Sequence, residues 1–135
     1  MLSPDYHPSE TEEFMSPRQL EYFRKKLLTW KNELLKDSNI TVQHLQELSA
    51  AEPDPGDRAT LESERALELR TRDRERKLIA KINEALRRID GGTYGYCEDT
   101  HEPISLRRLQ ARPIATLSLE AQERHERMER IHRVS

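Results

Sequence analysis

With 135 residues, of which 36% are charged, 34% hydrophobic and 5% aromatic, the chain has little apolar material for a broad globular core, which favours an elongated, mostly helical fold. Its formal net charge of -2 is unevenly spread, because residues 1–69 hold 14 acidic and 8 basic residues, whereas residues 70–135 hold 11 and 15. A generic nucleic-acid binder usually carries a concentrated basic surface without an acidic neighbour, so the composition disfavours that class.

The first predicted helix follows a short N-terminal tail. Residues 1–15 contain two prolines, several acids and no helical period, so we expect them to lie over the surface or to be disordered. Ser16 and Pro17 then fit an N-cap followed by proline at the first helical position. The apolar residues that follow have the 3-4 spacing of a coiled-coil seam: Leu20, Phe23, Leu27, Trp30 and Leu34. This stripe weakens over residues 36–39 and resumes imperfectly as far as Leu48.

A turn and a second helix complete a predicted hairpin. Residues 50–60 contain two prolines and a glycine within four positions, which cannot continue a helix. The second helix is expected to end at Gly91 and Gly92. Its apolar seam matches the base of the first helix: Ile79, Ile82, Leu86 and Ile89. We therefore predict a long antiparallel coiled-coil hairpin over residues 16–92 with its tip at residues 50–60.

Residues 93–135 are predicted to form a small globular base. Short β-like or turn elements extend to about Thr116, and a C-terminal helix begins at about Ser118. The single cysteine, Cys97, cannot form a disulfide within the chain, which favours a reducing compartment. No secretory signal and no run of 18 apolar residues is found, so we expect a cytoplasmic protein that does not enter a membrane.

Four positions in the base have the spacing of a two-plus-two zinc ribbon: Cys97, Thr100, Ser118 and Ala121. Three of them hold poor or impossible zinc ligands, and His101 and His125 fit ordinary surface or core histidines better than metal ligands. We therefore predict no structural zinc and no other bound metal. Hydrogen bonds from the two hydroxyl groups, with packing by the alanine, would replace the contribution of the metal to folding.

The predicted tip is strongly anionic. Residues 47–68 contain two bases and seven acids: Glu47, Glu52, Asp54, Asp57, Glu62, Glu64 and Glu68. Asp54 and Asp57 lie three residues apart and could face a cation, a magnesium-bound water or an arginine of a partner. A solvated turn in which one aspartate caps a helix explains the same spacing, and the spacing alone favours this simpler interpretation.

A basic run over residues 70–77 has two interpretations. It either solvates the helix or joins Lys81 and the arginines of residues 107–112 in a cleft for a phosphorylated nucleotide or an acidic partner. No nucleophile triad, metalloprotease helix or glycine-rich phosphate loop is present in the sequence. The paired carboxylates lie on an exposed turn without a pocket to tune them, so we do not expect an enzyme.

Four segments resemble the DksA/TraR family, in the same order and with family-like intervals from about Met15 onwards: DPGDRA (54–59), LELRTRDRERKLIAKI (67–82), YGYC (94–97) and RRLQARP (107–113). The resemblance implies a coiled-coil hairpin that enters the secondary channel of bacterial RNA polymerase and alters the lifetime of the open complex. Asp54, Asp57 and Ala59 then correspond to the functional tip residues of the family.

The resemblance also implies cooperation with the alarmone ppGpp in the stringent response. The alarmone would be bound between regulator and polymerase by Leu78, Lys81 and Arg112, with Arg74 as a neighbour in the interface. Gln122 occupies a basic position of the better-known zinc-containing members, which implies a weaker or differently arranged response to ppGpp.

Typical members of the family have four cysteines at the zinc-ribbon positions, so the chain resembles a zinc-independent branch that acts under zinc shortage or thiol oxidation. We expect a monomer that has no cofactor of its own and does not bind specific DNA sequences directly. Three alternatives stay open: a Gre-like transcript-cleavage factor that holds a catalytic magnesium ion at its acidic tip, a plain coiled-coil scaffold, and a direct DNA binder.

Overall fold

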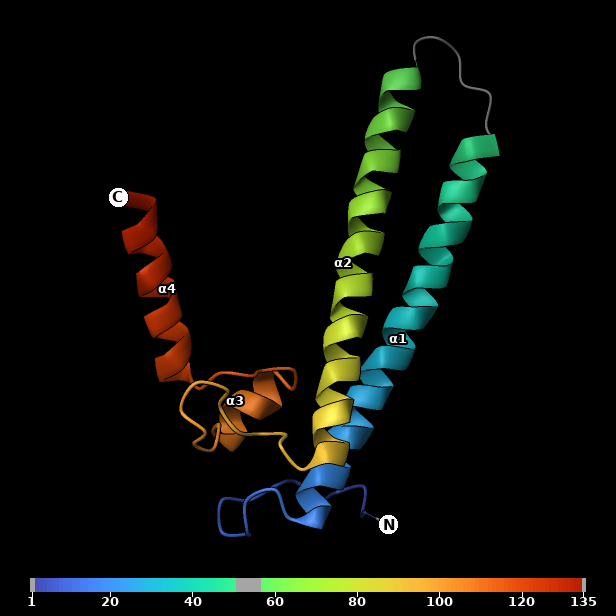
Figure 1. The fold of residues 1–135 in the computed structure, drawn as a ribbon. Coiled ribbons are helices and arrows are strands. Elements are labelled where there is room, and N and C mark those ends of the chain that lie inside the picture. Colours follow the sequence, from blue (N-terminus) through green and yellow to red (C-terminus); the bar gives the residue numbers. More distant parts are fainter. Residues whose placement is uncertain (1, 51–56, 135) are drawn as a thin grey trace. The chain divides into compact units, whose positions relative to one another are not determined.

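The computed structural model describes residues 2–50 and 57–134, and the described part is mostly helical (Figure 1). Its helices are, in chain order, α1 (Pro17–Ala50), α2 (Arg58–Gly91), α3 (Leu106–Ala111) and α4 (Leu119–Val134). Pairing of the β type in this part is limited to an isolated antiparallel bridge between Tyr96 and Pro103. The predicted mostly α fold is therefore confirmed. None of the described helices is long and apolar enough to cross a membrane.

The chain divides into two compact units. The base unit comprises Met1–Leu27 and Glu84–Ser135, and the outer unit comprises Leu28–Asn83. The outer unit therefore contains most of α1 and most of α2, whereas the base unit contains their remaining turns together with α3 and α4.

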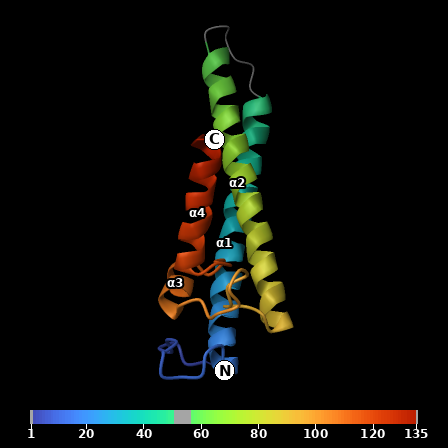
Figure 2. The ribbon, with the colours of Figure 1, turned by 60° about the vertical axis from the view of Figure 1, so that its left-hand side comes forward.

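Within the outer unit, α1 and α2 lie side by side and run in opposite directions, as Figures 1 and 2 both show. Leu48 of α1 and Ile82 of α2 are buried at positions that the apolar pattern predicts. The guanidinium of Arg65 donates a hydrogen bond of 2.8 Å to the carbonyl of Leu48 and so ties α2 to the last turns of α1. These contacts confirm the antiparallel hairpin that the two seams predict.

The ends of the long helices follow local sequence signals. The backbone N–H of Leu20 donates to the carbonyl of Ser16, so α1 begins at Pro17 as predicted. At the end of α2, Gly92 has a φ of +80°, and the N–H of Thr93 donates to the carbonyl of Arg88. Glycine tolerates this left-handed conformation, which ends the helix where the sequence predicts.

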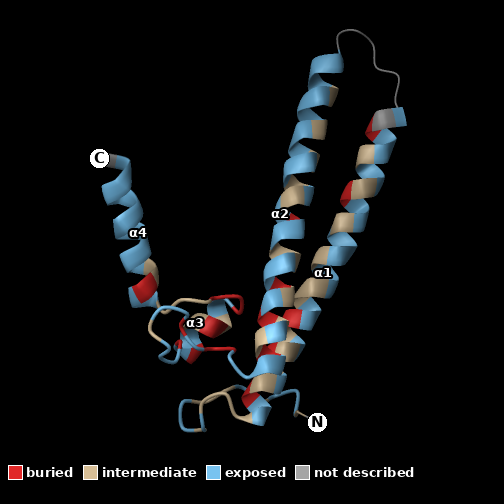
Figure 3. Ribbon diagram, viewed as in Figure 1, coloured by how far each residue is buried: buried red, intermediate tan, exposed pale blue. Residues whose placement is uncertain are grey.

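The base unit has a core of its own, and Figure 3 shows buried residues gathered there. Tyr94 is buried against Phe23 of α1, with ring centroids 5.6 Å apart. The Tyr94 hydroxyl donates a 2.8 Å hydrogen bond to the carbonyl of Pro113, which satisfies its polar atom inside the core. Other buried members of this core include Ile89, Ile104, Leu109, Ile114 and Ala121.

The N-terminal tail packs on the rest of the base unit. Of the two possibilities that the sequence left open, it therefore lies over the surface. Gln19 of α1 is fully buried, and its side chain accepts a hydrogen bond from the N–H of Met15 and donates one to the carbonyl of Ser9. Phe14 packs edge-to-face on Tyr96, with ring centroids 5.4 Å apart. The two hydrogen bonds of Gln19 thus hold the tail at Ser9 and at Met15.

Replacement of Gly95 tests the packing of the tail. Gly95 has a φ of +90°, and an added Cβ would lie 3.0 Å from Cε of Met15. We expect Gly95→Ala to lower the free energy of unfolding by about 1 kcal/mol or more, because it adds both backbone strain and a steric contact. Gly91→Ala is the matched control, since a Cβ there meets nothing within 4 Å. Equal denaturant midpoints for Gly95→Ala and the native protein would contradict this account.

Candidate functional site

The predicted acidic tip is partly described. Asp57 immediately precedes α2, and its carbonyl accepts a 3.0 Å hydrogen bond from the N–H of Leu61 in the first helical turn. Asp57 and Ala59 are both exposed. Asp54 lies outside the described residues, so its pairing with Asp57 stays a prediction. The described part of the tip presents a carboxylate to solvent at the start of a helix.

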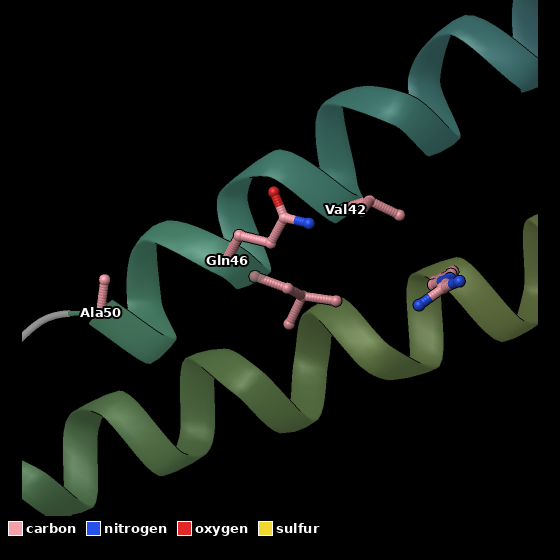
Figure 4. A pocket seen from close by; sticks show the side chains of 5 residues that line it. Val42, Gln46 and Ala50 are labelled. Atoms are coloured by element: carbon pink, nitrogen blue, oxygen red, sulfur yellow. The ribbon is translucent and has the colours of Figure 1, made fainter.

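A shallow hollow of about 510 Å³ lies along the side of the outer unit, close to this end of the helices (Figure 4). Val42, Gln46 and Ala50 line it from α1, together with Leu45. Arg72 of α2 supplies its one charged group. The sequence analysis noted Val42 only as part of an imperfect stripe and missed the hollow, because Arg72 comes from the other helix. Its lining contains no acidic side chain and no nucleophile.

The predicted alarmone positions lie in different units. Arg74 and Lys81 are exposed, and Leu78 is half-buried, all on α2 in the outer unit. Arg112 is exposed and follows the last residue of α3 in the base unit. The structure therefore places the three α2 residues on one helix, and whether Arg112 joins them stays a prediction.

Two nearby charges of the basic run already have partners. Arg76 and Lys77 both pair with Asp73, at 2.8 and 3.5 Å, on the exposed surface of α2. In the base, the Nε atom of Arg108 donates 2.8 Å to the carbonyl of Leu117 and so holds the segment that leads into α4. Part of the predicted basic cleft therefore has a structural role within the chain.

The zinc-ribbon positions meet in the base unit. Cys97 is buried, and the N–H of His101 donates to its carbonyl at 2.8 Å, which closes a tight loop. Ser118 caps α4, because its hydroxyl accepts a 3.2 Å hydrogen bond from the N–H of Ala121. Ala121 itself is fully buried. The sequence thus correctly predicts a Ser118 cap and small apolar packing by Ala121.

The acidity of the Cys97 thiol could not be read from the sequence. Burial raises its pKa, but hydrogen bonds from the side chains and backbones of Thr100 and Ser118 have a larger combined effect and lower the pKa of Cys97 to about 6. The thiolate is thus the main form at neutral pH. A buried anion held by these two residues joins the loop at 97–100 to the start of α4.

The residues present do not fit a four-ligand zinc site. Zinc prefers thiolate, imidazole or carboxylate ligands, whereas Thr100 and Ser118 offer neutral hydroxyl groups and Ala121 offers no ligand atom. His125 is instead paired with Asp99, with 2.6 Å between Nε2 and Oδ2. Across residues 2–50 and 57–134, no group of three or more histidine, cysteine or acidic side chains is placed to hold a metal ion.

Comparison with known proteins gives matches over nearly all of the chain. The family model described as DnaK suppressor protein DksA, N-terminal domain, matches residues 19–89. The family model described as prokaryotic dksA/traR C4-type zinc finger matches residues 92–127. The segment of the zinc-finger match thus contains the single cysteine of this chain.

Curated relatives and a solved structure agree with these matches. A Caulobacter vibrioides (strain NA1000 / CB15N) protein, RNA polymerase-binding transcription factor DksA, is 64% identical over 129 residues, which cover 96% of this chain and 91% of the relative. The Escherichia coli (strain K12) protein of the same name is 46% identical over 115 residues, covering 85% and 76%. The structure of transcription factor DksA2 from Pseudomonas aeruginosa matches with a TM-score of 0.84 and 41% identity, covering 91% of this chain and 93% of that chain. The chain therefore belongs to the DksA/TraR family, as its motifs predict.

Proposed function

We propose that this chain is a cytoplasmic regulator of bacterial transcription initiation that binds RNA polymerase. The observation that carries the proposal is its 64% identity, over 96% of its length, to a protein named as an RNA polymerase-binding transcription factor. The relatives compared above are named as transcription factors, which agrees with the expectation that the chain is not an enzyme. The chain acts on the polymerase as a monomer, without reading a DNA sequence itself.

The paired helices α1 and α2 enter the secondary channel of the polymerase, and Asp57 acts there with Ala59 and Asp54. Exposure of Asp57 and Ala59 at the start of α2 supports this role, because both side chains are available to a partner. A carboxylate at such a position attracts an arginine or a magnesium-bound water and carries out no bond cleavage of its own. The lifetime of the open complex is thereby altered, and each promoter responds according to its own kinetics.

The alarmone ppGpp binds at the interface with polymerase, beside Leu78, Lys81 and Arg112, with Arg74 as a neighbour. Exposed cationic groups at three of these positions supply the charge that a polyphosphate requires. Gln122 is uncharged and donates a 3.3 Å hydrogen bond to Glu126 within α4. It therefore adds no positive charge, and the stringent response through this chain is correspondingly weaker than with a basic residue there.

The base unit folds without zinc. Hydrogen bonds from Thr100 and Ser118 to the Cys97 thiolate support this proposal, because they join the segments that a metal would otherwise connect. Activity would then persist when zinc is scarce.

Asp57→Asn tests the role of the tip in initiation from a ribosomal RNA promoter with purified polymerase. We expect the variant to bind polymerase but to need roughly tenfold or more protein for half-maximal inhibition, on the order of one lost charge-assisted hydrogen bond. Glu33→Gln, which replaces an exposed acid on α1, is the charge-matched control and should behave as native.

Nucleotide release from stalled complexes would indicate a cleavage factor. Full inhibition by Asp57→Asn would indicate that the tip does not act through its charge.

A zinc chelator tests the metal-free base. We expect the thermal midpoint of the native protein, and its inhibition of the same promoter, to stay unchanged when a strong chelator is present throughout, because no zinc contributes to folding. The same protein with added zinc is the control. A midpoint that falls with chelator and recovers with zinc would refute zinc independence.

Thr100→Val tests the hydrogen bonds to the thiolate. Because the pKa of Cys97 is lowered from 9.0 to about 6, its ionisation contributes stability that is complete above pH 9 and is lost as the pH falls through 6. We expect Thr100→Val to raise the thiol pKa, measured by thiolate absorbance, and to lower stability at pH 8 more than at pH 5. Ser105→Ala, which removes a hydroxyl at the N-cap of α3, should lower stability equally at both pH values. An unchanged thiol pKa in Thr100→Val would contradict this account.

A further inference from the structure

The seam of the outer unit continues through polar residues where the sequence pattern is interrupted. Thr41 of α1 keeps the 3-4 spacing that leads on from Leu34, and it is buried. Glu75 of α2 lies at the corresponding spacing before Ile79 and Ile82, and it is buried as well. We call Asp37, Thr41, His44, Glu68 and Glu75 the polar seam.

The side chains of Thr41 and His44 have hydrogen-bond partners, whereas one carboxylate oxygen of Glu75 has none among the described residues. The Thr41 hydroxyl donates a 3.0 Å hydrogen bond to the carbonyl of Asp37, and Nδ1 of His44 lies 2.9 Å from Oε1 of Glu68. Glu75 is only 7% exposed. Its Oε2 atom is buried and has no hydrogen-bond partner among the described residues. A carboxylate buried in this way destabilises the pairing of the helices around it.

The surrounding charges add to this cost. Burial is the largest effect and raises the pKa of Glu75 above its ordinary value of 4.5. Asp37, across the seam on α1, raises this pKa as well, the neighbouring Arg74 lowers it, and Glu68 raises it further. Both acids therefore favour the protonated form of Glu75, and Arg74 opposes them; Asp37 and Arg74 are both exposed to solvent, which screens their effects.

The direction of the pH dependence follows from linkage. A carboxyl group whose pKa is higher in the folded than in the unfolded chain contributes stability below its unfolded pKa, near 4.5. That contribution disappears as the pH rises through the folded value. Protonation of Glu75 therefore strengthens the pairing of α1 with α2, and its ionisation as the pH rises weakens it.

We propose that Glu75 makes the outer unit a proton-responsive element, in which uptake of one proton by its buried carboxyl group tightens the pairing of α1 with α2 and release of the proton loosens it. The element belongs to the chain alone, so it does not depend on the proposed binding to polymerase. As a consequence, the conformational stability of the paired helices next to Asp57 changes with pH.

Hydrogen exchange of the full-length protein at pH 5.0 and 7.5 tests this proposal, with rates corrected for the intrinsic effect of pH. We expect backbone amides of the outer unit to be severalfold better protected at pH 5.0. Glu75→Gln, which resembles the protonated acid, should have the high protection at both pH values. Glu64→Gln removes the same charge at an exposed position of α2 and should keep the native pH dependence.

His44 must be separated from Glu75, because its Nδ1 atom lies 2.9 Å from Oε1 of Glu68, which itself acts on Glu75. The His44→Gln variant should retain the part of the pH dependence that Glu75→Gln loses. The proposal is overturned if Glu75→Gln keeps the native pH dependence, or if it is less protected than the native protein at pH 7.5. Should Glu75→Gln fail to fold, Asp37→Asn replaces it, with increased protection at pH 7.5 expected and unchanged protection contradicting the proposal.

Discussion

The structure depends on the pairing of α1 with α2 along one narrow stripe. A chain with 5% aromatic residues has few large side chains for a core, so each long helix must bury its stripe against the other. In the base unit, Phe23 packs against Tyr94, whose hydroxyl bonds to the carbonyl of Pro113, and Ile89 is buried as well. In the outer unit, the same stripe includes buried Thr41 and Glu75. The pairing is consequently strongest in the base unit and weakest where the seam is polar.

Local signals in the sequence predicted the helix ends well, whereas the polar residues of the seam were identified only in the structure. Proline at position 17 and the glycines at 91 and 92 act on their own backbone, so their effects can be read without a fold. Glu75 was missed because the periodicity was followed through apolar residues only, although the same register leads to it. The sequence did not decide whether the N-terminal tail is ordered. Its position depends on Gln19, whose hydrogen bonds to Met15 and Ser9 form only once α1 has formed.

The candidate sites divide in the same way. The spacing of Cys97, Thr100 and Ser118 predicted that these residues lie close together, because the zinc-ribbon fold brings its four positions together even where the zinc ligands are lost. The spacing could not predict the acidity of the thiol, which results from burial and hydrogen bonds together. The proposed role of Asp57 rests on the family resemblance, because an exposed carboxylate beside a helix has the same structure whether it contacts a partner or only solvent.

Among the described residues, Cys97 and Glu75 are buried groups whose ionisation affects stability in opposite directions. In the base unit, hydrogen bonds hold Cys97 as an anion, so a fall in pH through about 6 removes a stabilising charge. In the outer unit, the pKa of Glu75 is raised, so protonation of its carboxylate relieves a destabilising charge. Each effect follows from whether the buried anion has donors: Thr100 and Ser118 donate to the thiolate, while Oε2 of Glu75 has no donor in the described part of the chain. Acid therefore shifts stability from the base unit to the outer unit, because hydrogen bonds outweigh burial at Cys97, whereas burial is the largest effect at Glu75.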